Sequence, residues 1–131
     1  MPHDYWRYLS RPLPHATEAP AHARHLLRDV CEKWQLTALQ GVVELLVSEV
    51  VTNAVRHGEA PVQLWLAVHA HGLACAVADG DPQPPRMRTT SVDEESGRGL
   101  QLLTELADTW GSYPSSRDKL VWFTSELPGP E

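Results

Sequence analysis

The strongest constraint on the fold is a change in hydrophobic periodicity at Pro61. Before this residue, apolar side chains recur every three or four positions, which is typical of one face of a helix. After it, they alternate with polar or small residues, which is typical of a strand. The spacing predicts a helix over about 18–34 and a longer one over Thr37–His57, which Gly58 ends. Thr17 and Thr37 are the expected N-caps.

The second half of the chain is expected to supply most of the sheet. Residues 62–69 alternate as a strand, and the short link at His71-Gly72 favours a hairpin into the buried strand Leu73–Ala78. A closing hairpin is expected from Thr109–Pro114 and Leu120–Ser125. At the other end of the chain, Tyr5–Leu9 is expected to be an edge strand that Pro12 and Pro14 end.

A polar, proline-rich segment without periodicity separates the two groups of strands. It runs from Asp79 to Ser96, and a loop of this length inside a small domain is typically a functional lid, here expected over about 80–98. Gly97-Arg98-Gly99 then opens a third helix. The resulting order, β-α-α-β-β-lid-α-β-β, predicts an α+β fold: a two-layer α/β sandwich with a mainly antiparallel sheet and helices on one face.

Length and charge limit the possible functions. The 131 residues predict a single domain, 1–131, with its core at about 5–126. A net charge of −6 argues against a general nucleic-acid binder, which needs an excess of basic residues. The longest unbroken apolar run, Leu73–Ala78, is far shorter than the ~20 residues that cross a bilayer, and no secretory signal is visible. Cys31 and Cys75 are expected to be buried thiols, so a cytoplasmic protein is predicted.

The long helix carries the first residues suited to chemistry. Glu49, Asn53 and His57 are spaced i, i+4, i+8 and therefore share one face. An amide oxygen can ligate a hard cation such as Mg²⁺, and a carboxylate one turn away can take a proton from a nucleophile. The simpler interpretation is a solvated polar stripe on an amphipathic helix.

Two further candidate binding motifs follow the long helix in the sequence. Asp79 follows a buried strand, where it could accept a hydrogen bond from an exocyclic amine or could be a turn residue helped by Gly80. Gly97-Arg98-Gly99-Leu100 opens a helix, where backbone N–H groups can bind an anion or the glycines can form a hinge. The combination with the long helix favours one pocket between helices and sheet.

In this combination the chain resembles the GHKL ATPase superfamily, which includes the ATP-binding domains of gyrase, histidine kinases and MutL. The stretch ELLVSEVVTNAVRHG matches the N box of that superfamily, VADGDPQPP matches the G1 box in part, and GRGL matches the G2 box. Within the superfamily the chain is most similar to the small anti-sigma factor serine/threonine kinases of actinobacteria such as Streptomyces. The resemblance implies the Bergerat-type ATP-binding fold, with ATP and Mg²⁺ as cofactors.

The resemblance also implies residue roles. Glu49 would be the general base, Asn53 the Mg²⁺ ligand, and His57 a further polar residue near the phosphates. Asp79 would read adenine, while Gly97, Arg98, Gly99 and Leu100 would cradle phosphate. The implied partners are a sigma factor, which is sequestered, and an anti-anti-sigma protein of the STAS type, which is phosphorylated. A homodimer is also implied as possible.

The sequence departs from the family pattern at two places. The later glycines of the G1 box are missing from Asp79-Gly80-Asp81-Pro82-Gln83, and Leu120 stands where relatives often have a threonine near the nucleotide. These changes leave open an alternative: a catalytically weak or inactive nucleotide-binding module that acts by docking alone. A detached histidine-kinase catalytic domain is disfavoured, because the chain carries no dimerisation helix with a phospho-accepting histidine.

Histidines and tryptophans are the remaining candidates. The pairs His22/His25 and His69/His71 are expected to be solvated rather than zinc ligands, since no cysteine joins them. The five tryptophans are expected to pack in the core or on the sheet. Trp65 is the exception, because it alternates away from the apolar face and is expected to lie exposed where a partner or second subunit docks.

Overall fold

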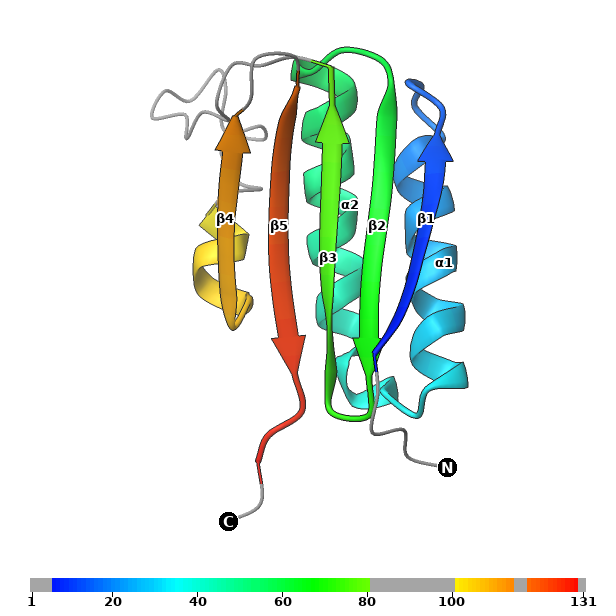
Figure 1. Ribbon diagram of the computed structural model, residues 1–131, viewed down its shortest axis with the longest axis vertical. Coiled ribbons are helices and arrows are strands. Elements are labelled where there is room, and N and C mark those ends of the chain that lie inside the picture. The colour runs from blue at the N-terminus through cyan, green and yellow to red at the C-terminus, as the bar shows by residue number, and fades with distance from the viewer. Residues whose placement is uncertain (1–5, 81–100, 115–117, 130–131) are drawn as a thin grey trace.

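Five antiparallel strands form one sheet in the computed structural model, which describes residues 6–80, 101–114 and 118–129. The strand order is β1-β2-β3-β5-β4 (Figure 1). The strands are β1 (Arg7–Leu13), β2 (Val62–His69), β3 (Gly72–Asp79), β4 (Thr109–Pro114) and β5 (Lys119–Glu126). The helices are α1 (Ala19–Lys33), the short 3-10 helix η1 (Thr37–Leu39), α2 (Gln40–His57) and the helical residues 101–106.

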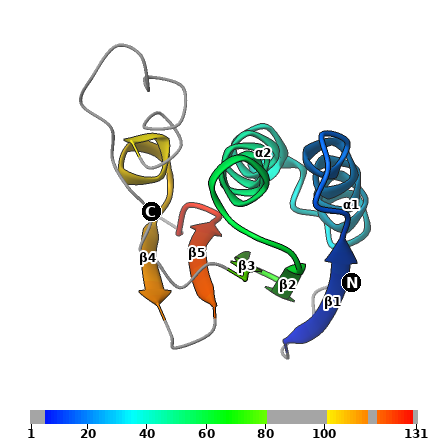
Figure 2. The ribbon, with the colours of Figure 1, turned by 90° about the horizontal axis from the view of Figure 1, so that it is seen from above.

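The described helices cover one face of the sheet (Figure 2). α1 lies over the β1 side, α2 lies over the middle of the sheet, and residues 101–106 lie over β4. The expected α+β fold, an antiparallel sheet with helices on one face, is therefore confirmed.

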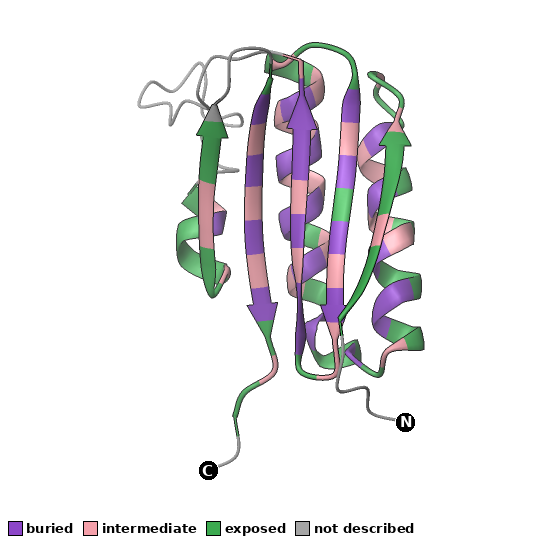
Figure 3. Cartoon of the chain, viewed as in Figure 1, coloured by how far each residue is buried: buried purple, intermediate pink, exposed green. Residues whose placement is uncertain are grey.

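The core lies between α2 and the inner face of the central strands. On β2 the four apolar residues that alternate along the strand are at most 3% exposed, and Trp65 between them is 42% exposed. Figure 3 shows this alternation of buried and less buried residues along the central strands. α2 contributes its buried apolar stripe: Val43, Leu46, Val47, Val50, Val51 and Ala54. Removing this surface from water is the main driving force that joins the two layers.

A charged pair on the surface also connects the first two helices. Arg28 on α1 donates two hydrogen bonds to the Glu44 carboxylate on α2, from Nη2 at 2.7 Å and from Nε at 3.3 Å. This paired geometry adds specificity of orientation. The hydrogen bonds from Arg28 hold the pKa of the Glu44 carboxyl below its ordinary value.

Most predicted boundaries agree with the structure to within a few residues. The long helix ends at His57 with Gly58 as its C-cap, and the closing hairpin joins β4 and β5. The β2–β3 hairpin turns through Ala70 and His71, one residue earlier than predicted, because His69 pairs with Gly72.

Two local predictions are wrong. β1 does not end at Pro12 but continues through it to Leu13, with Pro12 paired to Gln63. β1 is an edge strand, where a residue without an N–H donor is tolerated.

Neither threonine is an N-cap: Glu18 precedes α1 and Leu39 precedes α2, and neither makes a side-chain capping bond. Near Thr17, Pro20 has no N–H, and the Ala19 N–H already donates to the Ala16 carbonyl at 3.1 Å. The chain enters α2 through η1 instead, where the Leu39 N–H donates to the Leu36 carbonyl at 2.9 Å.

Both cysteines are buried free thiols, as predicted. Burial raises the pKa of Cys31 to about 11 and raises the pKa of Cys75 further. Since the thiolate is the reactive form, both residues are unreactive core side chains at neutral pH.

In the part of the chain that the structure describes, one helical segment, Thr37–His57, is long and apolar enough to cross a membrane by length and composition, with a mean hydropathy of 1.4. In this fold it packs its apolar stripe against the sheet and α1. The core helix of a globular domain satisfies the same criterion, so the segment is weak evidence for a membrane span.

Among the described residues, Phe123 is the largest fully buried side chain, and replacing it tests the placement of the core. Replacing Phe123 with Ala should lower the free energy of unfolding by about 3–5 kcal/mol, because the removed ring leaves a cavity. Chemical denaturation measures this difference. Tyr113→Ala is the control: Tyr113 is 69% exposed on edge strand β4, and its loss should change stability by no more than about 0.5 kcal/mol. Equal losses would contradict this placement of the core.

Candidate functional site

Three segments that are distant in sequence meet at one end of the sheet. α2 ends at His57, β3 ends at Asp79 and β5 begins at Lys119, all at the upper end in Figure 1. The antiparallel register of β3 and β5 places Asp79 directly opposite Lys119. Polar side chains from a helix and two strands therefore converge where the sheet ends.

Asp79 and Lys119 form a buried ion pair. The Lys119 Nζ atom lies 3.4 Å from the Asp79 Oδ2 atom, and the two side chains are only 7% and 3% exposed. Desolvation of the two charges is costly, and removing one partner leaves the other as an uncompensated buried charge. A buried ion pair is therefore weak evidence for a purely stabilising role.

Two glycines let the backbone pack closely at the end of β3, one of them against the Asp79 carboxylate. A Cβ atom at Gly58 would lie 2.3 Å from Asp79 Cγ and 2.5 Å from each carboxylate oxygen. A Cβ atom at Gly80 would lie 2.5 Å from the Ala60 carbonyl oxygen, and the Gly80 N–H donates to the Glu59 carbonyl at 2.6 Å. The α2–β2 connection thus fixes the end of β3 and leaves the carboxylate little freedom on the Gly58 side.

A small hollow lies between α2 and the sheet at this end. It has a volume of about 20 Å³, enough for about one water molecule. Its walls are Val50, Asn53, Ala54, Val77, Asp79, Lys119 and Val121. The hollow therefore combines apolar walls with an amide, a carboxylate and an ammonium group, and a larger ligand could present only a polar edge to it.

The three candidate residues of α2 differ in their environment. Asn53 is half-buried and lines the hollow beside Asp79. Glu49 is half-buried one turn earlier on the same face, and His57 is exposed at the last residue of the helix. The structure thus brings Asn53 and Asp79 together around the hollow, and it places neither Glu49 nor His57 among the residues that line it.

The remaining candidates lie outside the described residues. Gly97, Arg98, Gly99 and Leu100 belong to this group, as does the expected lid over about 80–98 apart from Gly80. The described chain resumes at Gln101, in the helix that follows the GRGL motif.

Leu120, which stands where relatives often have a threonine near the nucleotide, does not face the hollow. It pairs with Ala78, and strand alternation directs it to the opposite face of the sheet from Asp79 and Lys119. Lys119 is the functional candidate that sequence analysis missed. The alternation of β5 could have revealed it, because Lys119, Val121 and Phe123 share one strand face.

No group of three or more His, Cys, Asp or Glu side chains within the described ranges is arranged to hold a metal ion. His22 and His25 are exposed, and the rings of His69 and His71 meet edge to face with centroids 6.0 Å apart. At the α2 site the Asn53 amide oxygen is of the hard donor type that Mg²⁺ accepts, beside the waters and phosphate oxygens that this ion usually keeps.

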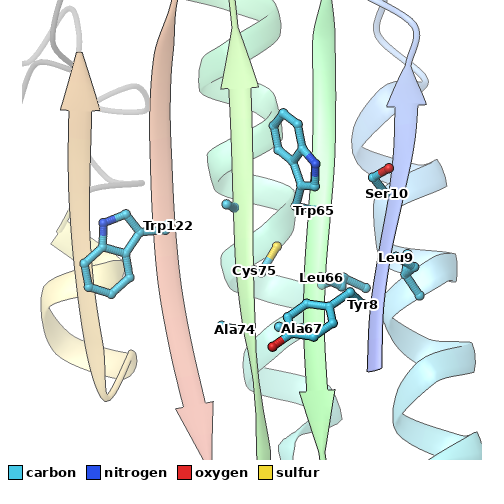
Figure 4. A pocket seen from close by; sticks show the side chains of 10 residues that line it. Tyr8, Leu9, Ser10, Trp65, Leu66, Ala67, Ala74, Cys75 and Trp122 are labelled. Atoms are coloured by element: carbon cyan, nitrogen blue, oxygen red, sulfur yellow. The ribbon is translucent and has the colours of Figure 1, made fainter. Parts of the chain in front are cut away.

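The opposite face of the sheet carries a separate apolar groove of about 540 Å³ (Figure 4). Aromatic rings of Tyr8, Trp65 and Trp122 lie around small residues that include Ala67 and Ala74. The predicted exposure of Trp65 is confirmed at 42%. A protein contact at this face stays a prediction.

A comparison with family models identifies the domain. The model of the histidine kinase-like ATPase domain matches residues 13–124, which includes α2, the buried end of β3 and most of β5. The chain belongs to the histidine kinase-like ATPase family. A search of curated proteins finds no match to the chain.

Membership of the histidine kinase-like ATPase family implies ATP binding, generally with Mg²⁺. The described residues have suitable chemistry for this ligand: a buried acceptor at Asp79, a hard oxygen donor at Asn53 and a carboxylate at Glu49. When bound, Mg²⁺ would neutralise phosphate charge beside Asn53.

The close approach of Gly58 to Asp79 makes a prediction about the site in this histidine kinase-like ATPase domain. Gly58→Ala should displace the Asp79 carboxylate from Lys119, lowering the free energy of unfolding by about 1–3 kcal/mol through overpacking. Thermal or urea unfolding measures the loss.

Gly41→Ala provides the matched control on the same helix. A Cβ atom at Gly41 meets nothing within 4 Å, so this change should stabilise α2 by up to about 1 kcal/mol. If both variants were equally stable, the carboxylate would not be confined by Gly58.

Proposed function

We propose that this protein is an ATP-dependent serine/threonine kinase of the anti-sigma factor type. It would phosphorylate an anti-anti-sigma partner of the STAS type and, when free of that partner, sequester a sigma factor to regulate transcription. The observation that carries the proposal is the family match over residues 13–124 together with Glu49 and Asn53 on the face of α2 beside Asp79. The proposed site of action is the cytoplasm.

In this proposal Glu49 acts as the general base. A hydroxyl oxygen of the partner's serine or threonine attacks the γ-phosphorus, the bond to the β–γ bridging oxygen breaks, and ADP leaves. The hydroxyl proton passes to the Glu49 carboxylate. Such transfers need little covalent help from the protein, so positioning and charge neutralisation supply most of the rate.

The remaining site residues would orient the nucleotide. Asp79 would accept a hydrogen bond from the exocyclic amine of adenine, and Asn53 would hold Mg²⁺ against the phosphates. Gly97, Arg98, Gly99 and Leu100 would supply backbone N–H groups and a positive charge to the phosphates, with His57 near them.

The charge of the chain supports release of the phosphorylated partner. The protein carries a net charge of −6, and phosphorylation adds roughly −1.5 to −2 charges to the partner at neutral pH. Repulsion between the two would free the kinase to bind its sigma factor. A homodimer formed through the exposed Trp65 face is compatible with this cycle.

The alternative is a nucleotide-binding interaction module with weak or no catalysis. One observation favours it: the later glycines of the G1 box are missing from Asp79-Gly80-Asp81-Pro82-Gln83. Such a module would bind the same partners without transferring phosphate.

Incubation with γ-labelled ATP and candidate STAS-type proteins distinguishes the two functions. For a kinase, Glu49→Gln should reduce phosphoryl transfer by about 10²–10⁴-fold, because the general base is lost while the side chain keeps its size. Glu32→Gln, an exposed glutamate on α1, should leave transfer unchanged. Partner binding without any transfer by the wild-type protein would favour the docking module.

A titration with a fluorescent ATP analogue tests the role of Asn53. In the wild-type protein Mg²⁺ should strengthen binding, and in Asn53→Ala this Mg²⁺-dependent gain should be lost while binding without Mg²⁺ is retained. Gln40→Ala, at the first residue of the same helix, is the control and should behave as wild type. An unchanged Mg²⁺ dependence in Asn53→Ala would rule out Asn53 as the ligand.

A further inference from the structure

Lys119 is placed at the proposed nucleotide site by the pairing of two strands. The β3–β5 register sets it opposite Asp79, and its Nζ atom lies 3.4 Å from the Asp79 Oδ2 atom. Both residues line the same hollow as Asn53. An acceptor and a donor are thus presented together from neighbouring strands.

The two members of this pair are both buried but differ in the length and number of rotatable bonds of their side chains. The Asp79 side chain is short, and the backbone at Gly58 lies directly against its carboxylate. Lys119 carries its ammonium group on a flexible four-carbon stem with three donors. A ligand edge that enters the hollow would therefore meet a fixed acceptor and an adjustable donor.

An amidine edge complements such a pair. In adenine, the exocyclic amine is a hydrogen-bond donor, and it lies next to a ring nitrogen that is an acceptor. A carboxylate alone recognises only the amine, since it has no donor when ionised. With Lys119 beside it, the site can recognise both groups of the edge.

We propose that Lys119 is a second base-reading residue, which donates a hydrogen bond to a ring nitrogen of adenine while Asp79 accepts from the exocyclic amine. This inference rests on the proposed binding of ATP. Lys119 also compensates the buried Asp79 charge, so that the carboxylate stays available as an acceptor. The small volume of the hollow means that the base presents its edge there and not its whole ring.

The test combines changes in the protein with changes in the ligand. Dissociation constants are measured for ATP, 1-deaza-ATP and 7-deaza-ATP, with wild-type protein and with Lys119→Met, which keeps the side-chain length and removes the donor. For the wild-type protein, one of the two deaza analogues should bind about tenfold to a hundredfold more weakly than ATP, as expected for a lost hydrogen bond to a charged donor. Lys119→Met should bind ATP more weakly than the wild-type protein does, again by about tenfold to a hundredfold. The variant should bind the same analogue no more weakly than it binds ATP.

A second pair of variants guards against a folding defect. Neither Asp79→Asn nor the double variant Asp79→Asn/Lys119→Met contains a lone buried carboxylate. Asp79→Asn leaves the Lys119 ammonium without its carboxylate partner, whereas the double variant removes both charges, and thermal unfolding verifies that each is folded. Asp79→Asn, which keeps Lys119, should still bind the same analogue more weakly than ATP. The double variant, which lacks Lys119, should bind the two equally well. A merely structural lysine would change stability without changing the ratio between ATP and its analogues.

Three outcomes would overturn the inference. Equal sensitivity to the analogues in wild type and Lys119→Met would show that Lys119 does not contact the ring. Tighter ATP binding by Lys119→Met would show that the ammonium competes with the base for Asp79. Insensitivity of the wild-type protein to both analogues would remove the ring contact altogether. If the wild-type protein bound no ATP at all, the proposed function itself would fail, which is a distinguishable result.

Discussion

The arrangement depends on the burial of α2 against the inner face of the sheet. Val50 and Ala54 are nearly inaccessible, and both line the hollow in which Asn53 lies. Because residues one turn apart share a helix face, anchoring the apolar stripe also determines where Asn53 and Glu49 point. The hydrophobic contact that stabilises the domain therefore positions the polar groups of its site.

The Asp79 carboxylate shows how the fold accommodates a buried charge. Lys119 supplies the opposite charge from the neighbouring strand, and Gly58 supplies space from the end of α2. Each of these contacts comes from a different element, so the site forms only when α2, β3 and β5 are all in place. Desolvation of a carboxylate is costly, and it is tolerated here because the compensating cation is built into the sheet register.

The two faces of the sheet have different chemistry. The inner face carries the apolar core and, at one end, the polar hollow. The outer face carries an apolar groove with Trp65 and Trp122 among its walls. Strand alternation separates these surfaces, which allows nucleotide binding on one side and protein contact on the other in the function proposed above.

Sequence periodicity by itself determined the element order, the antiparallel α+β class and the shared face of Glu49 and Asn53, because these depend on local repeats of 3.6 and 2 residues. It also placed Asp79 at the end of a buried strand. Local patterns gave wrong element boundaries where the position in the fold determines them. β1 continues through Pro12 because it lies at the sheet edge, and α2 begins after η1 instead of at a Thr37 cap. The alternation of β5 already indicates that Lys119 shares a strand face with Val121 and Phe123. Only the tertiary structure decided that Lys119 lies opposite Asp79, and that a side chain at Gly58 would collide with the Asp79 carboxylate. Both depend on the register and packing of segments distant in the chain, which no local pattern encodes.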